Sequence, residues 1–163
     1  MRSLRRTIVF AILSHWVVVV VQAETLRFEA EDGTLSGLNV SIAVEGYSGS
    51  GYVSGFSEGT ERVTWDFQST GGVYRLKIGF RTPGGAKGFA AFLNEGGVSG
   101  MFPGESDFAE FDAGRVVLES GSNRLAIGGG WNFYEIDYVE FEEAEAFAPP
   151  LEVAPVLVDP KAS

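Results

Sequence analysis

Three acidic side chains stand where they could share a cation. Glu29 and Glu31 are two residues apart, so on a strand both project from the same side, with their Cα atoms about 7 Å apart. Two carboxylates at that spacing raise each other's pKa unless a cation or a hydrogen-bond donor lies between them. Asp137 shares its face of a later strand with Val139 and Phe141, which we expect to point inward, so this carboxylate also needs a partner.

The first and last strands of a sandwich commonly pair, and such pairing would bring Asp137 to the two glutamates. Three carboxylates with nearby main-chain carbonyls suit Ca²⁺, which takes six to eight oxygen ligands. The spacing therefore points to a calcium site made of Glu29, Glu31 and Asp137. The alternative interpretation is that these acids are solvated strand ends.

A second group of residues has the chemistry of sugar recognition. A sugar ring stacks its axial C–H bonds on an aromatic face, and its hydroxyls need directed hydrogen bonds. Trp131 and Asn132 supply one of each, directly after the glycines at 128–130. Because Trp131 lies off any alternating pattern, we expect it to be exposed; core packing is the alternative. Arg81 is expected to bond sugar hydroxyls or to be a solvated strand end.

Composition excludes several kinds of catalytic and binding site. The chain has no cysteine, and its one histidine, His15, lies in the N-terminal apolar segment. Without them, the remaining chain cannot form a Ser-His-Asp triad, a Cys-His pair or an ordinary zinc site. Residues 24–163 carry a net charge of −13, because three of the 12 basic residues and none of the 22 acidic ones precede them. Such a surface disfavours nucleic acid and anionic membranes, and makes a neutral polysaccharide a more natural ligand than an anionic one.

The elements that must position these residues are strands. Apolar side chains alternate with polar or small ones in several segments, and Gly-rich turn signals separate these segments. The clearest alternating positions are Val63, Trp65, Phe67, Tyr74, Leu76, Ile78, Phe80, Phe89, Ala91, Leu93, Leu125 and Ile127. We therefore predict an all-β fold, an antiparallel sandwich or jelly roll of about ten strands, with Trp65 in its core.

The two ends of the chain differ from this middle part. The N-terminus has three arginines, an apolar run of about 15 residues, and small residues up to Ala23. This is typical of a secretory signal, and the run is shorter than the roughly 20 residues needed to span a bilayer. We predict a signal over residues 1–23, cleaved after Ala23, and a secreted protein; an uncleaved signal anchor is the alternative. Residues 24–143 form the predicted sandwich, and 144–163, rich in proline, form a predicted linker towards a further domain.

Three segments together resemble the family 35 carbohydrate-binding modules, particularly those that bind mannan. They are Phe28-Glu29-Ala30-Glu31 with the following Asp-Gly, Gly51-Tyr52-Val53-Ser54-Gly55-Phe56, and Trp131 through Phe141. The segments occur in family order and spacing, and the resemblance covers about residues 25–142.

This resemblance implies a jelly-roll sandwich with a structural calcium, at positions matching Glu29, Glu31 and Asp137 and a carbonyl near Gly51. It also implies a ligand site in the loops at one end, where the tryptophan and asparagine before the last strand face an aromatic from the early loops. Tyr47 and Tyr52 are the matching residues here, and core packing is the alternative for both.

We therefore predict a monomeric, non-catalytic module that targets an attached glycoside hydrolase to plant-type polysaccharide, most naturally β-mannan or a related hemicellulose. The final residues, Val158 to Ser163, resemble the lead-in to family 26 β-mannanase catalytic domains. One alternative is a small β-sandwich glycosidase or lyase, which needs two opposed carboxylates roughly 5–10 Å apart. Another is a protein-binding adhesive domain.

Overall fold

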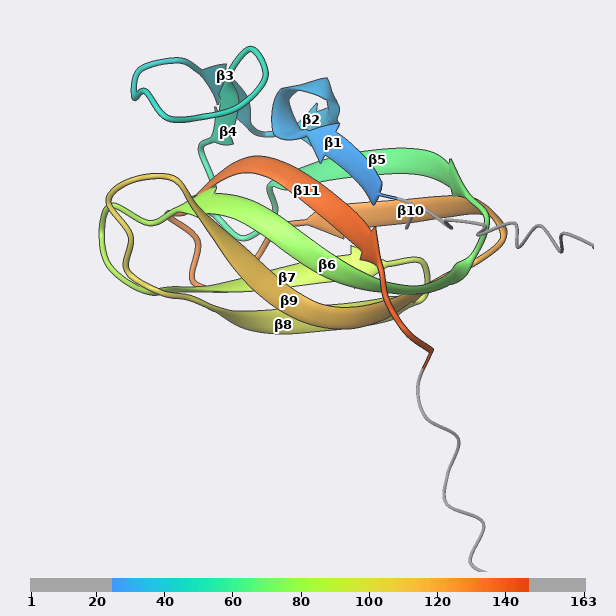
Figure 1. Ribbon diagram of the computed structural model, residues 1–163. Coiled ribbons are helices and arrows are strands. Elements are labelled where there is room, and N and C mark those ends of the chain that lie inside the picture. Colours follow the sequence, from blue (N-terminus) through green and yellow to red (C-terminus); the bar gives the residue numbers. More distant parts are fainter. Residues whose placement is uncertain (1–24, 147–163) are drawn as a thin grey trace, which may run out of the picture.

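The computed structural model describes residues 25–146. They form eleven strands and one 3-10 turn, arranged as two antiparallel sheets packed face to face (Figure 1). The predicted all-β sandwich is confirmed. The predicted signal at 1–23 and most of the predicted linker lie outside the described residues. Within residues 25–146, no helix is long and apolar enough to cross a membrane.

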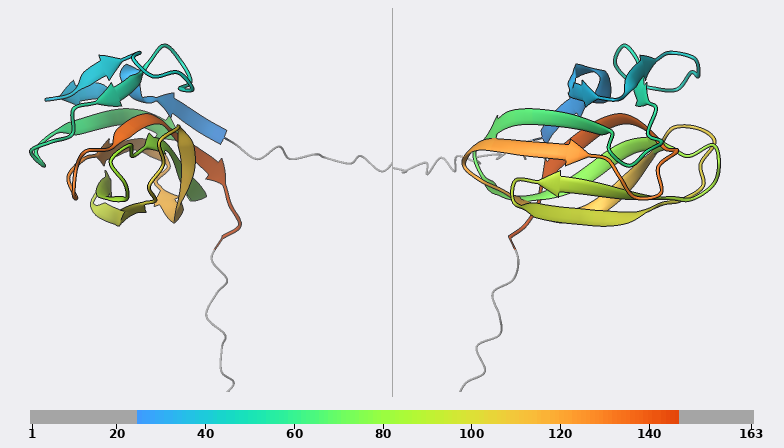
Figure 2. Two further views of the ribbon diagram at one scale, coloured as in Figure 1. Left: turned by 90° about the vertical axis from the view of Figure 1, so that its left-hand side faces the viewer. Right: turned by 180° about the vertical axis from the view of Figure 1, so that it is seen from behind.

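Each sheet combines strands that are distant in sequence. The first sheet has the order β3 (Asn39–Ser41), β4 (Tyr52–Ser54), β11 (Glu135–Glu143), β6 (Gly72–Arg81) and β9 (Ala109–Leu118), and β1 (Thr25–Glu29) also pairs with β11. The second sheet has the order β2 (Thr34–Ser36), β5 (Arg62–Ser69), β10 (Gly121–Ile127), β7 (Lys87–Leu93) and β8 (Gly96–Phe102). A 3-10 turn, Ala30–Asp32, follows β1. The end-on view on the left of Figure 2 shows the two layers.

The core follows from the alternation of side chains along the strands. All twelve positions that alternation marked as apolar are at most 8% exposed. Burying a large apolar side chain contributes about 1.5–3 kcal/mol, so these positions supply a large part of the driving force for folding. Trp65 is among them, as predicted, and its indole N–H donates to the carbonyl oxygen of Glu29 at 3.0 Å.

The first and last strands pair, as predicted from the sandwich architecture. Glu29 at the end of β1 stands opposite Tyr138 of β11 in an antiparallel ladder. On its other side β11 contains a bulge between Ile136 and Tyr138, where it pairs with β6. The residue in the bulge is Asp137, which is only 2% exposed. A bulge re-aims one side chain of a strand, which explains how Ile136 and Asp137 can both be buried although they are neighbours.

Four connections between strands meet at one end of the sandwich, on the left of Figure 1. They are residues 55–61, 82–86, 103–108 and 128–134. Main-chain hydrogen bonds join them: the Phe133 N–H donates to the Phe56 carbonyl at 2.8 Å, and the Thr82 N–H to the Glu105 carbonyl at 2.8 Å. This end therefore consists of loops that brace one another.

Candidate functional site

Trp131 is exposed on a loop whose path requires a glycine at position 130. Its side chain is 66% exposed, as predicted, and its N–H donates to the carbonyl oxygen of Gly88 at 2.9 Å. The preceding residue, Gly130, has φ +78°, and a Cβ atom there would lie 2.2 Å from the same carbonyl oxygen. A side chain at this position would force the loop away from β7, so the glycine holds Trp131 close against that strand.

Asn132 differs from its neighbour, because its side chain turns into the molecule. The residue is 8% exposed and has φ +56°. Its Oδ1 is buried without a hydrogen-bond partner, although a buried amide oxygen ordinarily has one. The predicted role of Asn132 was to meet sugar hydroxyls. As the loop stands, that oxygen lies beneath the surface, and the amide nitrogen is near Gly59, where a Cβ would lie 3.7 Å from it.

Phe133 is the surface aromatic that sequence reasoning missed. It is 62% exposed, its φ is +58°, and the amino nitrogen of Lys87 lies 5.9 Å from its ring centroid. A weak signal was available, since Tyr134 and Ile136 are buried and Phe133 has the opposite parity. The left-handed backbone that turns its ring outward is not visible in that pattern.

The two tyrosines expected opposite Trp131 lie in a different cluster. Tyr52 is 2% exposed, and its hydroxyl accepts a hydrogen bond from Ser41 at 3.0 Å, so its ring offers no open face. For Tyr52 the platform prediction is therefore wrong, and core packing, the alternative, describes the residue. Tyr47 is half-buried, and its ring packs 5.8 Å from that of Tyr52 and 6.5 Å from that of Phe108.

Arg81 is not the solvated strand end that was one of its two expected roles, and its role toward sugar hydroxyls stays a prediction. Its guanidinium donates to Glu135 at 2.7 Å and to the Ser106 carbonyl at 2.6 Å, and its side chain is only 12% exposed. It is therefore neither a solvated strand end nor an unengaged donor. Burial raises the pKa of Glu135, and the charge and hydrogen bond of Arg81 act in the opposite direction. The pair holds the start of β11 to the end of β6, where the two residues are register partners.

The three predicted calcium ligands all contact the loop between β3 and β4. Glu29 accepts a hydrogen bond from the Ser48 hydroxyl at 2.5 Å, and Asp137 accepts from the Ser48 N–H at 2.9 Å. Glu31 Oε1 accepts from the N–H of Ser50 at 2.5 Å and from that of Gly51 at 3.1 Å. Glu31 lies in the 3-10 turn and not on strand β1. It is therefore near the other two acids because all three bond to the same loop, and not because it shares a strand face with Glu29.

The electrostatics around these acids leave some negative charge uncompensated. Burial raises the pKa of Asp137 to about 6; hydrogen bonds from Ser48 oppose this rise and the charge of Glu29 adds to it. Glu31 Oε2 is buried without a hydrogen-bond partner. Hard oxygen donors with unmet charge are what Ca²⁺ prefers, so the donor chemistry fits the ion. Within residues 25–146, however, no group of three or more His, Cys, Asp or Glu side chains is arranged so that it could hold a metal ion.

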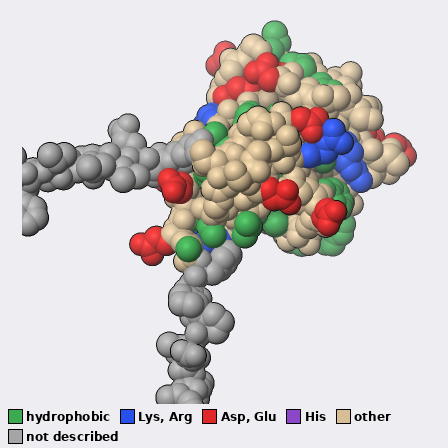
Figure 3. Space-filling model, turned by 90° about the vertical axis from the view of Figure 1, so that its right-hand side faces the viewer, with side chains coloured by type: hydrophobic (Ala, Val, Ile, Leu, Met, Phe, Trp, Pro, Cys, Tyr) green, Lys and Arg blue, Asp and Glu red, His purple; other side chains and the backbone are tan. Residues whose placement is uncertain are grey.

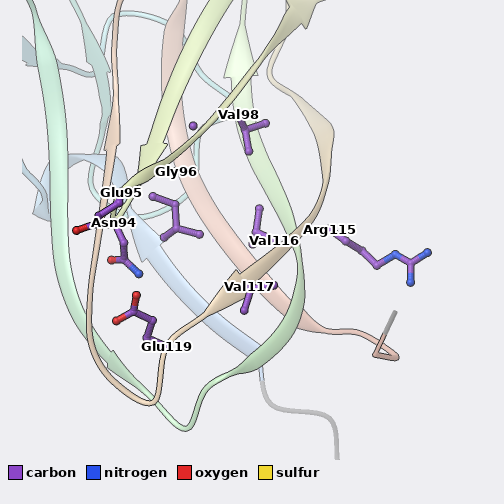
Figure 4. Close-up of a pocket in the computed structure, with 10 residues that line it drawn as sticks. Asn94, Glu95, Gly96, Val98, Arg115, Val116, Val117 and Glu119 are labelled. Atoms are coloured by element: carbon purple, nitrogen blue, oxygen red, sulfur yellow. The ribbon is translucent and has the colours of Figure 1, made fainter. Parts of the chain in front are cut away.

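A hollow of about 380 Å³ lies at the end of the sandwich opposite Trp131, between the β7–β8 turn and the C-terminal half of β9. In Figure 4 the side chains of Asn94 and Glu119 lie at one end of it, and that of Arg115 extends away. Its apolar lining is Leu93, Val98, Val116 and Val117, with no aromatic ring. Figure 3 shows this end of the molecule, where acidic side chains are spread over the surface. The hollow lacks the flat face that sugar stacking requires.

Comparison with known proteins gives one consistent family. The model of the carbohydrate-binding modules of family 35 matches residues 26–144. A mannan endo-1,4-beta-mannosidase of Thermothelomyces thermophilus is 38% identical over 114 residues, which are 69% of this chain and 24% of that protein. Mannan endo-1,4-beta-mannosidase A of a Piromyces species is 30% identical over 167 residues, 99% of this chain and 27% of that protein. The chain thus spans about a quarter of the length of these relatives.

Solved structures agree with the sequence relatives. The GH26-CBM35 beta-(1,4)-mannanase of Podospora anserina matches with a TM-score of 0.71 and 35% identity, over 85% of this chain and 32% of that one. A family 35 carbohydrate-binding module of Clostridium thermocellum matches with a TM-score of 0.68 over 75% of this chain and 100% of that one. Its identity is 20%, so this second match supports the fold alone.

Proposed function

The chain belongs to the carbohydrate-binding modules of family 35, and from that premise we propose that it binds β-mannan through Trp131 and so holds an attached hydrolase on its substrate. The module itself is non-catalytic. The observation that carries the proposal is the 66% exposure of Trp131 on a loop that Gly130 fixes against β7. A large exposed ring held in one place binds a sugar face without first losing conformational freedom.

The choice of mannan has two supports. The sequence relatives are named as enzymes that cleave mannan, and the Podospora structure joins a family 35 module to a mannanase. The acidic composition adds a physical reason, since a net charge of −13 over residues 24–163 repels uronic acid polymers more than a neutral mannan. Tethering an enzyme to the polymer raises its effective concentration there, with no new contact in the active site.

Calcium forms a further part of the proposal. Glu29, Glu31 and Asp137 would hold it, together with a main-chain carbonyl near Gly51, after a shift of their side chains, which as they stand in residues 25–146 do not form a metal-holding group. Its chemistry there would be structural: a divalent charge that compensates these carboxylates and ties β1, β11 and the β3–β4 loop together. The support is the buried, unpartnered Glu31 Oε2 and the raised pKa of Asp137.

Secretion, the monomeric state and the attached enzyme complete the proposal. The apolar segment before Ala23 supports export, and the composition of residues 144–163 supports a linker. The relatives support a joined mannanase, because this chain corresponds to about a quarter of each.

Affinity electrophoresis of the purified protein tests the ligand. Gels containing galactomannan, xylan or polygalacturonate are compared with a gel without polymer, and we expect retardation in the mannan gel above all. A reducing-sugar assay on the same protein should show no release from mannan. Equal mobility in all gels would overturn the binding proposal, and retardation in polygalacturonate alone would overturn the choice of a neutral polymer.

A further inference from the structure

Phe133 shares with Trp131 the features that make a sugar platform. Both rings are more than 60% exposed, and one residue, Asn132, separates them. Two residues of chain span at most about 7 Å between Cα atoms, so both residues lie at the same end of the sandwich, in the connection 128–134. We propose that Phe133 and the hollow beside it form a second sugar subsite, so that the module binds two separated units of one neutral chain. This inference rests on the proposed function and extends it.

The backbone holds Phe133 in a conformation that it would not adopt alone. Asn132 and Phe133 have consecutive positive φ values of +56° and +58°. Left-handed backbone is uncommon for residues other than glycine, and it is rarest for bulky ones. Such strain persists only where surrounding structure imposes it, and it clusters at functional sites. Here the Phe133 N–H is fixed to the Phe56 carbonyl at 2.8 Å.

The next residue, Tyr134, anchors the other side of the strained pair. Its ring stacks on that of Phe56 at 4.4 Å, and its hydroxyl donates to the Gly129 carbonyl at 3.0 Å. Tyr134 is 1% exposed. The fold therefore inserts one ring into the core and turns the preceding ring out, although burying Phe133 would have gained apolar contact.

The hollow beside Phe133 has the size and lining of a single subsite. Its volume is about 330 Å³, at the lower end of ligand pockets. The residues that line it are Ser54, Gly55, Phe56, Ser57, Pro83, Phe133, Tyr134 and Glu135. Two serines and the rings of Pro83 and Phe133 therefore line one space, and the Ser57 hydroxyl already donates to Glu61 at 3.1 Å. Polar groups beside a ring are the combination that a sugar requires.

The charge in this hollow favours a neutral ligand. Its one carboxylate, Glu135, is 2.7 Å from the guanidinium of Arg81, which compensates its charge. The Lys87 amino group lies 5.9 Å from the Phe133 ring, a cation–π distance, and β7 continues from there to Gly88 beneath Trp131. Lys87 thus lies beside the Phe133 platform, and its ammonium is a hydrogen-bond donor for sugar hydroxyls there.

Dependence of binding on ligand length tests the second subsite. Isothermal titration calorimetry with mannobiose and mannohexaose is run on the parent protein, Trp131→Ala, Phe133→Ala and Phe133→Tyr. A two-unit ligand engages the Trp131 platform alone, whereas the longer ligand reaches both. We expect Phe133→Ala to lose about tenfold or more in affinity for mannohexaose and to keep the parent affinity for mannobiose. Trp131→Ala should weaken both, and Phe133→Tyr should match the parent.

A matched control is Phe92→Ala, which removes a phenylalanine 43% exposed on the second sheet and should leave both affinities unchanged. A Phe133→Ala protein that binds mannohexaose like the parent, or that loses affinity for both ligands equally, would overturn the second subsite and leave the proposed function standing. Loss in Phe133→Tyr as large as in Phe133→Ala would also overturn it, because the aromatic face is still present. A parent protein that binds neither ligand would overturn the proposed function, and the subsite with it.

Discussion

The main-chain N–H of Ser48 donates to both carboxylate oxygens of Asp137, at 2.9 and 3.1 Å. The hydroxyl of the same serine donates to Glu29 at 2.5 Å and accepts from Arg27 at 2.9 Å. One residue of the β3–β4 loop therefore bonds to both the first and the last strand. The loop is fixed by polar contacts to carboxylates, and any cation at those carboxylates would act on the loop as well.

Removal of calcium should lower the stability of the fold. A ligand that binds only the native state adds RT ln(1 + [L]/Kd), about 2.7 kcal/mol at one hundred times Kd. We expect chelation with EDTA to lower the melting temperature by several degrees, and Glu31→Gln to abolish most of that difference. Glu95→Gln, in the β7–β8 turn, is the control and should respond to the chelator like the parent. Identical melting curves with and without chelator would contradict a calcium site in this protein.

Acid should destabilise the connection 55–61 through Glu61, which holds it with hydrogen bonds to Ser57 and Glu58. Burial alone would raise the pKa of this carboxyl, but hydrogen bonds from the N–H groups of Glu61 and Glu58 and from Ser57 outweigh it and lower the pKa to about 2. A lowered native pKa means that the unfolded chain binds more protons between about pH 4.5 and 2. The stabilisation is therefore complete above that window and is lost as the pH falls through it.

Thermal melts from pH 7 to pH 2 check this prediction. The parent should lose stability below about pH 4.5 more steeply than Glu61→Gln, which cannot titrate at this position. Glu58→Gln is the matched control, because only its main-chain N–H, and not its side chain, bonds to Glu61. Parallel pH curves for the parent and Glu61→Gln would contradict the assignment.

Side-chain alternation was enough to predict the strands and the core, because every second residue of a strand faces the core. The pairing of β1 with β11 also followed from general sandwich architecture. The position of Glu31 did not, since it depends on a local 3-10 turn that breaks the parity of β1. Arg81 found its partner Glu135 through strand register 54 residues away, which no local pattern contains.

The same reasoning explains the aromatic residues. Trp131 was predicted to be exposed from its glycine-rich surroundings, and Trp65 to be buried from its alternation, and both predictions are confirmed. Phe133 was missed because its direction depends on the φ angles of Asn132 and of Phe133 itself. Tyr52 was uncertain because it begins a short strand of three residues, too few to show a period.

Gly130→Ala should damage both folding and binding. The new Cβ would lie 2.2 Å from the Gly88 carbonyl, and φ +78° is unfavourable for alanine. Gly85→Ala is the matched control, because φ at Gly85 is +87° but the new Cβ would have no neighbouring atom within 4 Å. The control should lose about 1 kcal/mol from its backbone angle alone and bind mannan like the parent. Gly130→Ala should lose more stability, and its affinity should fall as the Trp131 loop moves off β7. Equal melting temperatures for the two variants would contradict the close contact.

The decisive comparison is between the two tryptophans of the sandwich. Trp131 is 66% exposed and Trp65 is 5% exposed, so the same substitution should have opposite consequences at the two positions. Trp131→Ala removes a stacking face and opens no cavity. It should weaken binding of mannan oligosaccharides by about ten- to a hundredfold, if a sugar on the ring contributes on the scale of a nucleic acid base stacked on an aromatic side chain, roughly 1–3 kcal/mol. Its melting temperature should stay close to that of the parent.

Trp65→Ala should lose about 3–5 kcal/mol of unfolding free energy, because it leaves a cavity in the core and removes the hydrogen bond to the Glu29 carbonyl. Its folded fraction should still bind sugar at Trp131. Calorimetry with mannohexaose and thermal melts on the same three proteins separate the two effects, since each variant should move one measurement and not the other. A Trp131→Ala protein that melts far below the parent would mean that the ring supports the fold, and one that binds as tightly as the parent would mean that the sugar lies elsewhere. Either outcome would remove Trp131 from the site, because a platform must contribute to binding while leaving the fold intact.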